Sequence, residues 1–140
     1  MISYKVEGDK HLIRALERIK GKVEKKVARS ALGKGATIAT RQIKRAVPAD
    51  LKGLRKSIGR RSKTYKHSGT IVIVIGPRFA WRDPKTGKQP SAEALKIEYG
   101  DETTPARPFM RRAFSSSKAE IETAIRKGAW EGIRREAAKK

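Results

Sequence analysis

Hydrophobic residues recur at steps of three and four over two long stretches of this chain, one near each end. Such spacing places apolar side chains on one face of an α-helix. The first stretch, residues 10–47, predicts a helix roughly 55 Å long if it is unbroken, at 1.5 Å per residue. The second, residues 108–138, predicts another long helix. Because glycine weakens helices, Gly21, Gly33 and Gly35 are candidate bend or break points of the first helix. Close packing of the helix against another element is the better account of the glycines in GKGA at 33–36.

Three other segments have the pattern of β-strands. Residues 2–7 alternate apolar and polar side chains, which predicts a short amphipathic strand. Residues 57–66 alternate weakly, and a turn at 67–69 separates them from the run TIVIVI at 70–75. This run is β-branched and apolar on both faces, which is typical of a buried strand. We therefore expect residues 70–75 to form a central strand, covered on both faces by helices or by a neighbouring subunit.

Proline and glycine mark the connecting segments. Residues 48–58 are expected to be irregular, with Leu51, Leu54 and Ile58 facing inwards. Residues 76–91 are rich in Gly and Pro, and they predict an extended basic loop. Residues 91–99 predict one or two helical turns. An extended arm at about 100–108 comes next, because Pro105 and Pro108 each disfavour helix in the preceding residue.

The order of these elements predicts an α+β fold, in which a small antiparallel sheet packs against a long N-terminal helix and a long C-terminal helix. With 140 residues, the chain is expected to form a single domain. The arm is followed directly by Phe109 and Phe114, two of the three Phe in the chain. A rigid connector with such an apolar anchor can fix a helix to its own domain or reach a neighbouring subunit, and the residues alone favour neither.

Composition limits the chemistry open to this chain. There is no Cys, which excludes disulfides and thiolate metal sites. His11 and His67 are the only imidazoles, and their spacing matches no metal or catalytic motif. Glu98, Asp101 and Glu102 cluster, but Arg107, Arg111 and Arg112 follow closely, so we expect internal ion pairs there. We therefore expect no enzymatic activity, no cofactor and no metal site. A small nuclease or toxin would need a general base that the sequence does not offer.

Charge is the strongest compositional signal. Lys and Arg number 35 against 14 Asp and Glu, which gives a net charge of +21. A field of this size attracts polyanions or acidic proteins. One quarter of the chain is especially basic and predicts a patch for DNA phosphates or an acidic partner, made of Arg41, Lys44, Arg45, Lys52, Arg55, Lys56, Arg60, Arg61, Lys63 and Lys66. This charge fits a stand-alone nucleic-acid-binding protein. The alternative is that the charge serves only to keep the protein soluble.

The sequence shows neither a secretory signal nor an apolar run of membrane-spanning length, so we expect a soluble protein made in the cytoplasm.

Two short motifs resemble the neck, or tail-completion, proteins of long-tailed bacteriophages, which are minor tail and head–tail connection components. The first resembles the family's G-x-L-x-x-S-I element after a proline and comprises Pro48, Gly53, Leu54, Ser57 and Ile58. The second resembles its V-E-[FY]-G-T … P-F-[LM]-x-P-A element and comprises Ile97, Glu98, Tyr99, Gly100, Pro108, Phe109, Met110, Arg112 and Ala113. The chain departs from the pattern in three places: Gly53 and Leu54 are adjacent, Asp101 replaces a Thr, and Arg112 replaces a Pro.

The resemblance implies a structural virion protein that forms a homo-oligomeric ring at the head–tail junction, lining or flanking the DNA passage. Its implied partners are further copies of itself, the head-completion or connector protein, the tail terminator or tail tube, and genomic DNA bound without sequence preference. No membrane partner is implied, and assembly would take place in the host cytoplasm. The residues expected at the oligomer interface are Glu98, Tyr99, Gly100, Pro105, Pro108, Phe109, Met110 and Phe114.

Overall fold

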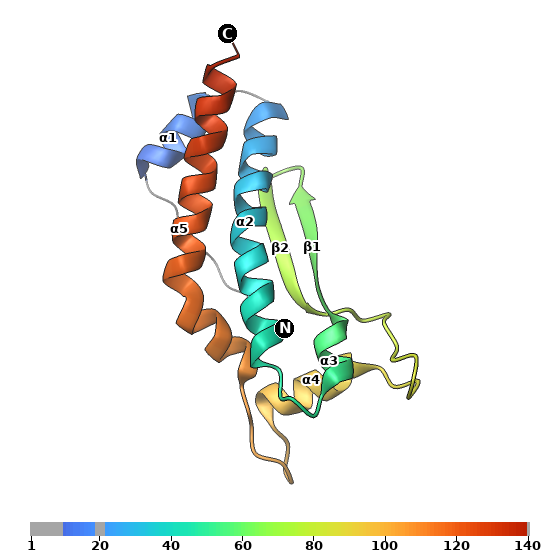
Figure 1. The fold of residues 1–140 in the computed structure, drawn as a ribbon. Helices are drawn as coiled ribbons and strands as arrows, with labels where there is room; N and C mark the ends of the chain where they lie inside the picture. Colours follow the sequence, from blue (N-terminus) through green and yellow to red (C-terminus); the bar gives the residue numbers. More distant parts are fainter. Residues whose placement is uncertain (1–9, 19–21, 140) are drawn as a thin grey trace. The chain divides into compact units, whose positions relative to one another are not determined.

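A computed structural model describes residues 10–18 and 22–139 of the chain (Figure 1). The strand expected at residues 2–7 lies outside the described residues. The chain forms, in order, α1 (Lys10–Arg18), α2 (Lys22–Ala46), α3 (Lys52–Ser57), β1 (Ile58–Tyr65), β2 (Thr70–Pro77), α4 (Pro90–Tyr99) and α5 (Phe109–Ala137). The predicted α+β class is confirmed, with a two-stranded antiparallel sheet and two long helices, α2 and α5.

The chain divides into two compact units, and each of them contains parts of α2, of the β1–β2 hairpin and of α5. Of the described residues, unit 1 comprises 10–18, 22–37, 62–74 and 119–139, and unit 2 comprises 38–61 and 75–118. Each unit has a hydrophobic cluster of its own.

Unit 1 is built on close packing between α2 and α5. Its cluster contains Leu12, Ala31 and Ala129, and the half-buried Ile125, Trp130 and Ile133 pack against it. The backbone of α2 at Gly35 lies directly against the side chain of Ile125, because a Cβ at Gly35 would lie 2.5 Å from Cγ1 of Ile125. The two helices are also joined by Lys34 Nζ and Glu131 Oε2, 2.8 Å apart.

The first helix does not break at Gly33 or Gly35, because α2 is continuous from Lys22 to Ala46. The expected close packing is confirmed at Gly35 and not at Gly33, where a Cβ would meet nothing within 4 Å. Glycine costs a helix about 1 kcal/mol relative to Ala. At Gly35 this cost is offset by packing against α5, which leaves no room for a side chain. Helix α1 is a separate helix that ends at Arg18, before residues 19–21, which lie outside the description.

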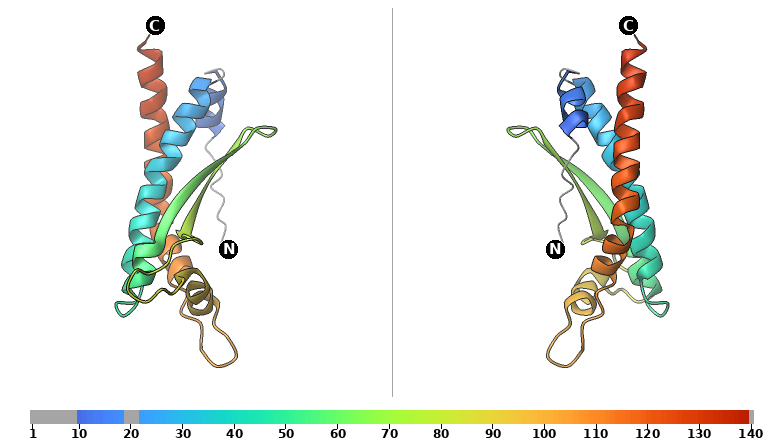
Figure 2. Two further views of the ribbon diagram at one scale, coloured as in Figure 1. Left: turned by 90° about the vertical axis from the view of Figure 1, so that its right-hand side faces the viewer. Right: turned by 90° about the vertical axis from the view of Figure 1, so that its left-hand side faces the viewer.

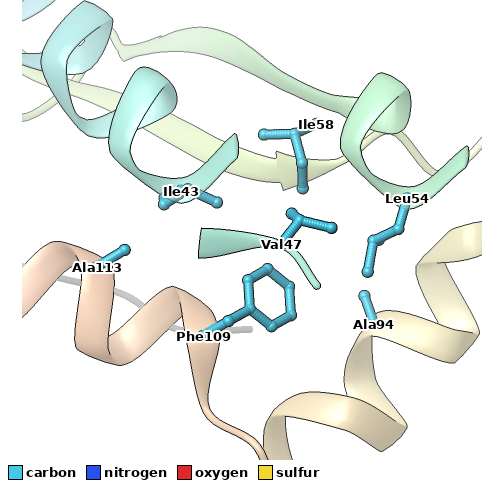
Figure 3. Packing of buried hydrophobic residues seen from close by; sticks show 7 residues of the cluster. All are labelled: Ile43, Val47, Leu54, Ile58, Ala94, Phe109 and Ala113. Carbon is cyan, nitrogen blue, oxygen red and sulfur yellow. The ribbon is translucent and has the colours of Figure 1, made fainter. Parts of the chain in front are cut away.

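Unit 2 surrounds the second cluster, which joins α2, α3, β1, α4 and α5 (Figure 3). Its members are Ile43, Val47, Leu54, Ile58, Ala94, Phe109 and Ala113. The ring of Phe109 lies beside Val47 near the middle of this cluster (Figure 3). Because Phe109 is only 6% exposed, it anchors the start of α5 to the end of α2.

Two expectations about the middle of the chain are corrected. Residues 48–58 are not irregular throughout, since residues 52–57 form α3. The inward-facing residues are as predicted, because Leu54 and Ile58 are buried and Leu51 packs on their cluster. In the part of the chain that the structure describes, β2 pairs only with β1. Its expected central position is therefore wrong for this part, and its apolar run is half-buried.

No helix among the described residues is long and apolar enough to span a membrane.

Candidate functional site

The junction between α4 and α5 is organised by one buried carboxylate. Glu98 lies near the end of α4 and is 2% exposed. Its Oε2 accepts a hydrogen bond of 2.9 Å from the backbone N–H of Met110, and its Oε1 accepts one of 3.0 Å from that of Arg111. The first N–H groups of a helix have no partner within the helix. Glu98 therefore caps α5 from another helix, where the helix dipole also favours a negative charge.

The same carboxylate is neutralised by a side chain of α5. Arg111 Nε lies 3.1 Å from Glu98 Oε1, and Arg111 Nη2 donates a 2.9 Å hydrogen bond to the backbone oxygen of Glu98. The guanidinium also lies over the ring of Tyr99, 5.0 Å from its centre. A buried charge is tolerated when it is paired and hydrogen-bonded. The expected internal ion pairing of Glu98 is confirmed.

The arm between α4 and α5 folds back on itself as a closed loop. At its base, the N–H of Arg107 donates a 2.7 Å hydrogen bond to the oxygen of Ile97. Gly100 has a φ of +73°, which favours glycine, and a Cβ there would lie 2.7 Å from the backbone nitrogen of Ala106. The loop extends from the lower end of unit 2 (Figures 1 and 2). Its shape is therefore fixed by local contacts.

Asp101 holds the inside of this loop. Its Oδ1 accepts hydrogen bonds from the N–H groups of Thr103 (2.9 Å) and Thr104 (2.6 Å). Its Oδ2 lies 3.1 Å from Nζ of Lys96. The Lys96 ammonium, followed by the Thr103 N–H, holds the pKa of Asp101 well below its usual range. Asp101 is the residue that replaces the usual Thr of the resembled family, and here it serves as the turn-forming side chain.

The first resembled motif also serves the structure of unit 2. Ser57 is fully buried and donates a 2.6 Å hydrogen bond to the oxygen of Leu54. Arg78 closes the end of α3 by donating from Nε to the oxygen of Ser57 and from Nη2 to that of Lys56. A Cβ at Gly53 would lie 2.5 Å from Oδ2 of Asp83. These contacts hold α3 against the segment that follows β2, through Arg78 and Asp83.

The predicted interface residues differ in how accessible they are. Glu98 and Phe109 are buried, whereas Tyr99 and Pro105 are exposed. Intermediate exposure is found for Gly100, Pro108, Met110 and Phe114. The role of this set at an oligomer interface stays a prediction. Its buried members hold the α4–α5 junction together, so they position the exposed members.

All ten residues of the predicted basic patch are exposed. Eight of them lie in unit 2, at the end of α2, in α3 and at the start of β1, and Lys63 and Lys66 lie in unit 1. Arg55 is also used locally, because it donates hydrogen bonds to the oxygens of Lys44 (3.2 Å) and Val47 (3.3 Å) at the end of α2. Lys63 Nζ lies 4.8 Å from the ring centre of Tyr65. The use of the patch for DNA or an acidic partner stays a prediction.

Two surface features were not anticipated from the sequence. On α2, an open hollow is lined by Lys25, Lys26, Arg29 and Ser30. Helix α4 buries Pro90, Ala94 and Glu98 and leaves the larger apolar side chains Leu95 and Tyr99 about half exposed. The spacing of Leu95 and Tyr99, four residues apart, was a visible signal for an apolar stripe. The spacing alone does not predict that this apolar stripe faces solvent.

Among the described residues, no group of three or more His, Cys, Asp or Glu is placed to hold a metal ion. His67 is exposed in the β1–β2 turn. The side chains of Glu98, Asp101 and Arg111 at the junction and in the loop are used for capping and ion pairing.

Comparison with models of protein families matches residues 10–81 to the model described as "Bacteriophage HK97-gp10, putative tail-component". Comparisons with curated proteins and with solved structures gave no match. The family match covers just over half of the chain and includes the first resembled motif. It confirms the resemblance to phage tail proteins, and it is consistent with a structural rather than an enzymatic role in the virion. The chain belongs to the HK97-gp10-like family of bacteriophage tail components.

Proposed function

We propose that this chain is a structural virion protein that forms a homo-oligomeric ring at the head–tail junction, next to the passage for the DNA. The observation that carries the proposal is membership of a phage tail-component family. The net charge of +21 supports it, because a ring around a passing genome lies within a few ångströms of a polyanion. Copies of the chain, the connector and the tail tube or terminator are its proposed partners.

The buried α4–α5 junction supports a role in assembly. Glu98 and Phe109 fix the start of α5 and the closed loop before it, so the exposed residues of this region are presented in a defined conformation. A preorganised surface loses less conformational entropy when it binds. Tyr99 and Pro105 are the exposed members of the predicted interface set.

The exposed basic residues support contact with DNA or with an acidic face of a neighbouring ring. Lys and Arg side chains bind phosphates without reading the sequence. Arg60 and Arg61 are both exposed on β1 and belong to this patch. We expect replacement of both by Glu to preserve the fold and to reduce genome retention or docking in particles. Unchanged particle yield and unchanged DNA content would remove the patch from the proposal.

Oligomerisation of the purified chain tests the ring directly. Sedimentation velocity over a range of concentrations, followed by electron microscopy of the largest species, is expected to reveal closed particles with one central opening. A species that stays monomeric at every concentration, and that is absent from purified virions, would contradict the proposal.

A stand-alone nucleic-acid-binding protein is the second candidate, and the net charge of +21 favours it. Salt dependence separates the two. A DNA binder would bind free duplex tightly, with log affinity falling by about 0.9 per phosphate contact per log unit of salt. The ring subunit is expected to bind free duplex weakly and to retain its assembly when DNA is absent.

A further inference from the structure

Unit 2 exposes two apolar surfaces on segments that extend in different directions. The loop at residues 78–89 extends to the right in Figure 1, and the α4 region with the 100–107 loop lies at the lower end (Figures 1 and 2). Phe79, in the first loop, is 80% exposed. Leu95 and Tyr99, on α4, are 54% and 50% exposed. Water contact with such large side chains is unfavourable, by about 25 cal/mol per Å² of apolar surface.

The two segments that carry these surfaces have formal charges of opposite sign. The Phe79 loop contains Arg78, Arg82, Lys85 and Lys88 against a single carboxylate, Asp83. The segment at residues 93–102 contains Glu93, Glu98, Asp101 and Glu102 against a single lysine, Lys96. These four are more than a quarter of the 14 acidic residues of the chain, and they lie within ten positions. Copies with a net charge of +21 repel one another, so a contact between copies is favoured where this acidic segment meets a basic one.

Not every acidic side chain of the segment is available. Glu98 is buried and paired with Arg111, and Asp101 is paired with Lys96. Glu102 is exposed at the beginning of the loop, directly after this pair. On the basic side, Arg78 is used to close the end of α3, whereas Lys85 and Lys88 are exposed near the far end of the loop. The charges that remain exposed are Glu93 and Glu102 on one side and Arg82, Lys85 and Lys88 on the other. We assign the contact to Glu102 and the two lysines, which lie in the two loops.

We propose that the Phe79 loop of one copy docks on the Leu95–Tyr99 face of the next copy, with Lys85 and Lys88 towards Glu102. This inference rests on the proposed ring, and it names the contact that closes it. A contact between two different surfaces of the same chain is heterologous, and heterologous contacts build rings when the rotation between copies closes. An apolar anchor surrounded by complementary charge is also the usual arrangement of strong contacts at protein interfaces.

Two substitutions test the two sides of this contact separately. Phe79→Ser removes the inserted side chain, and Leu95→Ser removes part of the receiving face. Each is expected to raise the concentration at half assembly by about tenfold or more. Both side chains are exposed, so the thermal unfolding of each variant should match that of the wild type. Tyr65→Ser is the matched control, since Tyr65 is 46% exposed on β1. This substitution is expected to leave assembly unchanged.

Mixing the two variants gives the sharpest result. The Phe79→Ser copy keeps a receiving face and the Leu95→Ser copy keeps an intact loop, so one contact can still form between them. The mixture is expected to yield a one-to-one dimer at a concentration where each variant alone is monomeric. Lys88→Glu and Glu102→Lys should likewise weaken assembly singly and restore it when combined in one chain.

The outcomes of these experiments distinguish a failure of the proposed contact from a failure of the proposed ring. If the wild type forms rings and both Ser variants assemble equally well, the ring stands and the Phe79 contact is overturned. The contact is also overturned if the variants are impaired but their mixture yields no dimer. If the wild type itself never assembles, the proposed ring fails, and this contact fails with it.

Discussion

Glu98 and Arg111 form an ion pair that also starts a helix. The Oε1 atom of Glu98 accepts hydrogen bonds from both the backbone N–H and the side-chain Nε of Arg111, at 3.0 and 3.1 Å. The pair joins α4 to α5 across the closed 100–107 loop, whose first residues include the exposed Glu102. A change at Glu98 is therefore expected to affect the position of the loop and the stability of unit 2 together.

Replacing Glu98 by Ala is expected to destabilise the protein by about 2–4 kcal/mol, because it removes a helix cap and leaves a partly buried Arg unpaired. Glu98→Gln retains one acceptor oxygen and should cost less. The free energy of unfolding from urea titration measures both effects. The control is Glu93→Ala on the same helix, where the side chain is exposed and a change within about 0.5 kcal/mol is expected. An equal effect at the two positions would contradict the capping role.

Phe109→Ala is expected to lower the free energy of unfolding by about 3–5 kcal/mol, the usual loss for a buried aromatic residue. Phe109 is 6% exposed within the cluster of unit 2, whereas Phe79 is 80% exposed. Phe79→Ala is therefore the matched control and should change stability by less than about 0.5 kcal/mol. Denaturant midpoints of the two variants give the comparison. Similar midpoints would mean that Phe109 does not anchor α5.

Gly100→Ala combines a strained backbone with a steric clash. A positive φ at a residue with a side chain costs about 1–3 kcal/mol, and the added Cβ would lie 2.8 Å from the oxygen of Thr104. Gly69 has a similar φ of +71° with nothing within 4 Å, so Gly69→Ala measures the strain alone. We expect Gly100→Ala to lower the melting temperature more than Gly69→Ala. The reverse order would show that the loop opens easily.

The low pKa of Asp101 predicts a loss of stability in acid. Its pKa is depressed in the folded state by Lys96 and the Thr103 N–H, so the folded chain binds fewer protons than the unfolded chain. The stabilisation is complete above the unfolded pKa of about 3.9 and decreases as the pH falls below it. The difference in melting temperature between wild type and Asp101→Asn should be constant from pH 7 to about pH 4 and should shrink as the pH is lowered further, towards about pH 2. A difference that stays constant over the whole range would exclude Asp101 as the source.

The sequence was sufficient to predict those elements whose structure is determined by the local pattern of residues. The β-branched run of β2 and the periodic apolar residues of α5 predicted those elements. Helix α3 was missed because six residues are too few to display a helical period, and because Gly53 argues against a helix. The continuity of α2 through Gly35 depends on contact with Ile125, 90 positions further along the chain.

The candidate site was predicted only in part, for a related reason. Glu98 was expected to be paired because three Arg residues follow it closely in the sequence, but its burial and its capping of α5 were not foreseen. These depend on backbone groups 12 and 13 residues away. Likewise, the exposure of Leu95 follows from the burial of Ala94 and Glu98 beside it, which only the packing of α4 decides.

Imaging of the assembled particle at side-chain resolution tests the central claim most directly. The account predicts a closed ring of copies of this chain at the head–tail junction, surrounding the DNA passage, with the 78–89 loop of each copy against α4 of the next. Density for isolated copies elsewhere in the virion, or a virion that lacks the chain altogether, would contradict it.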